Sequence, residues 1–89
     1  MILLSNGTAT GSPAVWGGGS GVFAAAGTFS GATVKLQFLG PDNATWIDVG
    51  TDTTLTSAGA GYFVLHGAQI RAAVTGGPPS GIYASAEQV

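Results

Sequence analysis

The sequence has no cysteine and very few charged side chains. Without cysteine, neither a disulfide framework nor a thiolate metal site can stabilise the fold. Charged residues make up 7% of the chain, against about 25% in an ordinary soluble domain. Only Lys35 and Arg71 are basic, so the chain lacks the clustered positive charge of a nucleic-acid or anionic-lipid binding surface. We therefore expect no nucleic-acid partner, and apolar runs such as 22–26 are too short to cross a membrane.

The low charge is not a sign of disorder. Hydrophobic residues make up 45% of the chain and its mean hydropathy is +0.40, whereas disordered segments are polar and highly charged. A net charge of −2 on so apolar a chain favours association. We therefore expect its surface to be covered in a homo-oligomer or a larger assembly.

Long helices are not expected either. The 16 glycines and 4 prolines interrupt every stretch long enough to form one. Short runs rich in β-branched and aromatic residues lie between glycine turns instead. The sequence predicts an all-β fold, a small β-sandwich or jelly-roll-like barrel of about six to eight short antiparallel strands with an extended N-terminal arm.

Alternating apolar and polar residues give the strand positions. The clearest strand is 33–39, in which three apolar side chains alternate with Lys35 and Gln37. A Gly-Pro-Asp-Asn turn at 40–43 predicts a hairpin with 45–49. Further strands are expected at 21–29, 62–65, 69–74 and 82–89. The expected core consists of Val34, Leu36, Phe38, Trp46, Phe63, Leu65, Ile70, Ala72 and Val74.

Residues 1–20 differ in composition from residues 21–89. Their glycine, serine and threonine content is typical of a linker, so we expect an extended arm at 1–20 and a β-sandwich domain at 21–89. A solvated linker has no need of large apolar residues. We expect those of the arm to bind a neighbouring subunit or a larger assembly: Ile2, Leu3, Leu4, Val15 and Trp16. The alternative is that Trp16 folds back and caps the chain's own sandwich.

No set of reactive side chains accompanies the strand pattern. His66 is the only histidine, whereas a zinc site takes three or four ligands. Asp42, Asp48 and Asp52 lack the spacing and the closing glutamate of a calcium loop. The glycines at 17–21 are not followed by the lysine of a phosphate-binding loop. We therefore expect no catalytic residue, no metal site, no cofactor and no enzymatic activity.

Three segments from Gly31 onward form a recognisable pattern. They are ATVKLQFLGPD at 32–42, TWIDV at 45–49 and QIRAAVTG at 69–76. The strand, Gly-Pro-Asp turn and Thr-Trp strand, followed by an Ile-Arg-Ala strand, resemble small virion proteins encoded by tailed bacteriophages. The match spans residues 31–89 and concerns residues that determine the fold.

The resemblance implies a capsid decoration (cement) protein on the surface of the virion. Its partners would be the major capsid protein and further copies of itself, as a homo-oligomer that the resemblance implies to be a trimer. The alternative, from a different class, is a carbohydrate-binding or adhesin module of a phage fibre or tail spike. Exposed coplanar Trp and Tyr rings would favour sugar binding, and buried rings would favour the decoration protein.

Overall fold

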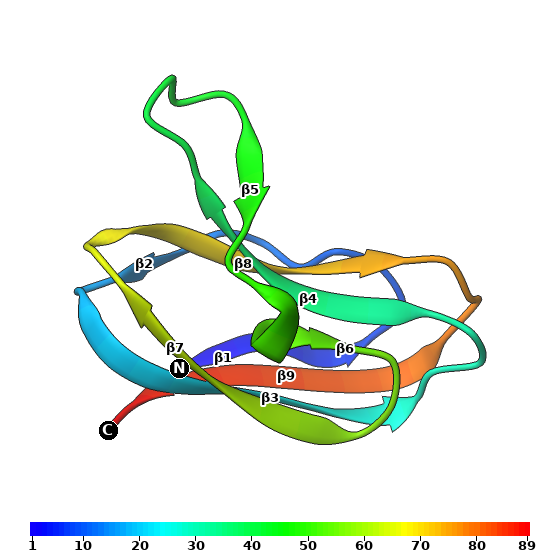
Figure 1. The fold of residues 1–89 in the computed structure, drawn as a ribbon. Helices are drawn as coiled ribbons and strands as arrows, with labels where there is room; N and C mark the ends of the chain where they lie inside the picture. Colours follow the sequence, from blue (N-terminus) through cyan, green and yellow to red (C-terminus); the bar gives the residue numbers. More distant parts are fainter.

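A computed structural model describes residues 1–89 and consists almost entirely of β-strands (Figure 1). The only helical element is the 3-10 turn η1 (Thr51–Thr53). The strands are β1 (Ile2–Gly7), β2 (Ala14–Trp16), β3 (Gly19–Thr28), β4 (Thr33–Leu39), β5 (Trp46–Asp48), β6 (Thr54–Leu55), β7 (Gly59–Leu65), β8 (Ala68–Thr75) and β9 (Ser80–Gln88).

These strands form two antiparallel sheets. Sheet A has the strand order β1-β9-β3-β7, and sheet B has the order β2-β8-β4-β5, with β6 also paired to β4. The two sheets lie one above the other, and η1 fills the gap between them at one side (Figure 1). The predicted all-β fold and small β-sandwich are therefore confirmed.

Period-two alternation explains which side chains fill the space between the sheets. Phe23 and Ile82 of sheet A and Leu36 of sheet B are completely buried, because alternate side chains of each strand point inward. The expected core residues that are buried are Val34, Leu36, Phe63, Leu65, Ile70 and Ala72. Phe38 and Val74 are partly buried and pack against this cluster. The core also includes Leu3, Leu4, Trp16, Phe23, Ala25, Phe29, Ile82, Ala84 and Ala86.

The expectation that Trp46 lies in the core is wrong. In the β4–β5 ladder Trp46 pairs with Leu39 and Ile47 pairs with Phe38. This register places Trp46 on the outer face of sheet B, where the guanidinium of Arg71 lies 4.3 Å from its ring centroid. The hairpin tip projects away from the sandwich (Figure 1), so neither face of its outer part is enclosed between the sheets.

The prediction of a separate N-terminal arm at 1–20 is also wrong. Residues 2–7 form β1, which pairs with β9 in sheet A, and residues 14–16 form β2, which pairs with β8 in sheet B. The boundary expected at 20/21 falls inside β3. Pairing in both sheets satisfies the backbone of this segment and buries its inward apolar side chains. The chain is therefore one sandwich that includes its first twenty residues.

Trp16 links the two sheets. Its side chain is 2% exposed, and its ring centroid lies 5.0 Å from that of Phe63 on β7 of the opposite sheet. Gly21 makes room for this pair, because a Cβ atom there would lie 2.7 Å from the Trp16 ring and 2.9 Å from the Phe63 ring. The alternative that Trp16 caps its own sandwich is confirmed.

Replacing Trp16 by alanine is expected to lower the free energy of unfolding by about 3–5 kcal/mol, because it leaves a cavity between the sheets. Val15, the preceding residue on the same short strand, is 72% exposed. Val15→Ala is the matched control and is expected to cost less than about 1 kcal/mol. Urea unfolding followed by tryptophan fluorescence or circular dichroism measures both. Equal losses for the two variants would contradict the position of Trp16.

Candidate interaction surface

The structure separates the five residues predicted to bind a partner. Leu3, Leu4 and Trp16 belong to the core, so they cannot bind another protein while the sandwich is folded. Their expected role as anchors is therefore wrong. Ile2 and Val15 are 67% and 72% exposed, but they lie on strands of different sheets.

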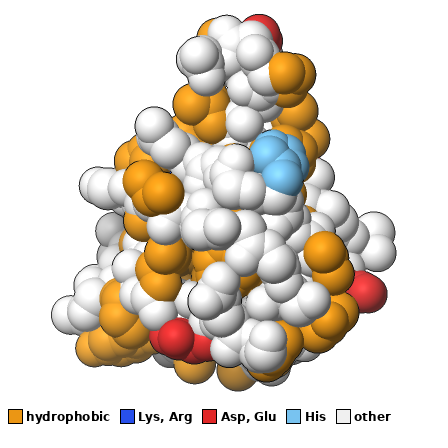
Figure 2. Space-filling model, turned by 90° about the vertical axis from the view of Figure 1, so that its left-hand side faces the viewer, with side chains coloured by type: hydrophobic (Ala, Val, Ile, Leu, Met, Phe, Trp, Pro, Cys, Tyr) orange, Lys and Arg blue, Asp and Glu red, His pale blue; other side chains and the backbone are white.

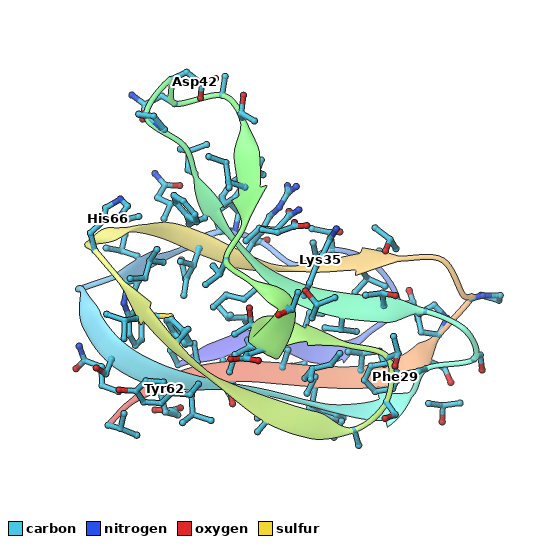
Figure 3. All side chains as sticks on the ribbon, viewed as in Figure 1. Phe29, Lys35, Asp42, Tyr62 and His66 are labelled. Carbon is cyan, nitrogen blue, oxygen red and sulfur yellow. The ribbon has the colours of Figure 1, made fainter.

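A surface that the sequence did not reveal lies on the outer side of sheet A. Its exposed side chains include Tyr62 and Val64 of β7 and Tyr83 of β9, which are 56%, 67% and 52% exposed. In Figure 3 Tyr62 lies on the side of sheet A that faces away from sheet B. The ladders place small or apolar residues of β3 beside them. We call this surface apolar face A; it consists of Ile2, Val22, Ala24, Ala26, Ala60, Tyr62, Val64 and Tyr83.

Apolar face A contains a shallow hollow. Its volume is about 200 Å³, and Ile2 and Tyr83 border a floor of small residues that includes Ala24 and Ser85. A cavity of about 150 Å³ is large enough for benzene. The hollow therefore has room for one large apolar side chain of a partner.

Charge is almost absent from this face. The one charged side chain is that of Glu87, which lies opposite Val22 in the ladder and forms an ion pair with the amino group of Met1. Neither Lys35 nor Arg71 lies on sheet A. A view of one end of the sandwich likewise shows hydrophobic side chains at the surface and no lysine or arginine (Figure 2). Burial of apolar face A by a partner would thus require little desolvation of charge.

The outer face of sheet B is polar by contrast. Asp48 accepts hydrogen bonds from Gln37 Nε2 at 2.8 Å and from Lys35 Nζ at 3.2 Å. Arg71 Nε donates to Gln37 Oε1 at 3.0 Å, and its guanidinium stacks on Trp46. The hydrogen bond from Gln37, followed by that from Lys35, lowers the pKa of Asp48. Both basic side chains of the chain are therefore engaged within sheet B.

The hairpin tip and His66 form the remaining polar region. A hollow of about 380 Å³ lies between the two and is lined by Asn43, His66 and Gln69 among others. The His66 ring lies edge-on to Phe38 with a centroid distance of 5.6 Å. No group of three or more His, Cys, Asp or Glu side chains gathers there or elsewhere in residues 1–89. The region offers polar contacts without an evident metal-binding set.

The alternation that builds apolar face A is visible in the sequence at 62–65. Tyr62 and Val64 alternate with Phe63 and Leu65, but both pairs are apolar, so the pattern does not say which pair faces the core. The contact of Phe63 with Trp16 decides this in the structure.

No family model, curated protein or solved structure matches the chain. No helix in the structure has the length and apolar character needed to span a membrane.

Asp42 at the hairpin tip gives a pH-dependent prediction (Figure 3). Its carboxylate accepts hydrogen bonds from the Thr45 hydroxyl and from the backbone N–H groups of Thr45 and Ala44, which lower its pKa from 3.8 to about 2. A pKa below that of the unfolded chain means that this stabilisation is present above about pH 4 and is lost as the pH falls through about 2. Carboxyl NMR titration should give that midpoint, and Asp42→Asn should remove the accompanying amide shifts of Thr45. A midpoint near 4 would contradict the observed loop geometry.

Proposed function

We propose that this protein is a capsid decoration protein, a structural component that binds the outer surface of a tailed-phage head and stabilises it. The observation that carries the proposal is the exposed, nearly uncharged apolar face A. Exposed apolar side chains gathered on one face of a protein are typical of a protein interaction site. The resemblance to phage virion proteins implies that the partner is the major capsid protein.

The size of apolar face A fits a component that acts in many copies. Four strands spaced about 4.8 Å apart, each with about seven residues at about 3.3 Å per residue, give the whole outer side of sheet A an in-plane area of roughly 450 Å². A stable pairwise interface buries about 800 Å² on each partner. One copy of this face alone is therefore expected to bind weakly, and shell binding would draw on several contacts per copy or on several linked copies.

A carbohydrate-binding module is the alternative, and the exposure of Tyr62 and Tyr83 is the observation in its favour. Strand β3 lies between their strands, and their ladder partners on it, Val22 and Ala26, are four positions apart. Four residues span about 13 Å along a strand, so the two rings cannot stack on one sugar ring. Trp46 is the one tryptophan outside the core, and the guanidinium of Arg71 lies over the face of its ring. These distances favour a protein partner.

Replacing Tyr83 by glutamate tests the proposal, because it places a carboxylate at the hollow of apolar face A. In the phage that encodes this chain, the gene is replaced by that of the variant. Particles are then purified from the infected culture. Quantitative mass spectrometry then gives the copies per particle. We expect hundreds of copies of the unmodified protein and a loss of roughly tenfold or more for Tyr83→Glu, since an unpaired carboxylate is costly to bury.

Val15→Glu is the matched control for this experiment. It adds the same charge at an exposed apolar residue on sheet B and is expected to leave the copy number unchanged. Circular dichroism melting checks that both variants are folded. Absence of the unmodified protein from the particles would contradict the decoration function, and equal loss with both variants would contradict the role of apolar face A.

A further inference from the structure

The four sheet edges of this fold are not equally protected against pairing with another strand. Sheet A ends at β1 and β7, and sheet B ends at β2 on one side and at β5 with the two-residue β6 on the other. The β1 ladder is interrupted by two register shifts, β2 has three residues and follows Pro13, and β5 has three residues and carries Asp48. Bulges, short length, proline and charge are the usual devices that block edge pairing. Each of these three edges therefore has at least one of them.

Strand β7 has none of these four devices, and the one neighbouring segment is η1, whose Asp52 backbone lies against Gly61 near the start of the strand. It is seven residues long, pairs with β3 in unbroken register, and contains no charged residue and no proline. Its only strand neighbour is β3, and none of the backbone hydrogen bonds outside the ladders and helical turn involves β7. Alternate N–H and C=O groups on its free side are thus available to another strand.

The segment 49–53 lies beside this edge without filling the space next to it. A hollow of about 240 Å³ lies between residues 49–53 and the end of β7 formed by Tyr62, Phe63 and Val64. Tyr62 and Val64 are more than half exposed. An added strand would pair with the free backbone groups and place its own outward side chains beside Tyr62 and Val64.

We propose that β7 is a self-association edge, at which the β7 strand of a second copy pairs in antiparallel orientation. A two-fold axis through Phe63 places Tyr62 opposite the second copy's Val64, and the same contact occurs a second time by symmetry. Pairs of an aromatic and a β-branched residue stabilise antiparallel ladders. No like charges meet, because β7 carries none.

The symmetry of this contact distinguishes it from other assemblies. An isologous contact closes at two copies and uses up the edge, so it gives a dimer, whereas the resemblance to phage proteins implies a trimer. The contact forms between free chains and does not depend on shell binding. It therefore goes beyond the proposed function and can be tested without particles.

Sedimentation of the purified protein from about 1 to 500 μM measures the association, since small interfaces of this kind dissociate at micromolar concentrations. We expect a monomer–dimer equilibrium. Val64→Glu should weaken it roughly 100-fold, about tenfold for each of the two carboxylates placed at the contact. Val15→Glu is the matched control, because it changes an exposed valine on an edge strand of the other sheet, and it should leave the dimer intact.

Hydrogen exchange of the unmodified protein identifies the edge independently of any variant. Amides of 59–65 should exchange more slowly as the concentration rises, while those of β2 and β5 should not change. A monomer throughout the concentration range, a trimer, a dimer that Val64→Glu and Val15→Glu weaken equally, or a dimer with concentration-independent exchange at 59–65 would each overturn the proposal.

Discussion

The packing of Trp16 against Phe63 is the contact on which the rest of the sandwich depends. It joins β2 of sheet B to β7 of sheet A at a distance of 5.0 Å between ring centroids. The indole N–H has no hydrogen-bond partner in the protein, so packing holds the side chain in place. The chain has no cysteine for a disulfide, and a domain this small has little core to spare. Burying Trp16 fixes β2 beside β8, turns Val15 outward, and places Phe63 inward so that Tyr62 and Val64 face solvent.

The sequence predicted the strands with clear alternation and failed where glycine has a packing role. Strand 33–39 was predicted with its observed bounds because polar and apolar residues alternate strictly there. The segment 1–20 was misread, since its glycines look the same as those of a flexible linker. Gly11 is needed where the backbone of Leu3 lies against it, and Gly21, just after the segment, is needed for the Trp16 ring. Trp46 was misplaced because no local pattern shows that a hairpin leaves the sandwich.

The candidate surface was less predictable than the fold because it depends on where the few charged residues lie in the folded chain. The two basic residues lie on β4 and β8, where Lys35 and Arg71 join Asp48 and Gln37 in one network. Sheet A receives no basic side chain, and the outward side chains of its strands are apolar or small apart from Glu87. The scarcity of charge in the sequence led us to expect a partner. The partner-binding residues, however, were predicted within residues 1–20. Three of the five residues chosen there were apolar because they belong to the core.

The two proposed contacts of sheet A reinforce each other. Pairing at β7 would join two copies of sheet A into one sheet, whose outer surfaces form a single apolar face of roughly 900 Å² on the same strand geometry. Doubling the face brings it closer to the roughly 800 Å² of surface that each partner buries in a stable contact. Two copies of a small chain thereby present one larger surface for binding a partner, and no longer sequence is needed. A linked pair of faces also gains from effective concentration, because binding by the first face holds the second near its site.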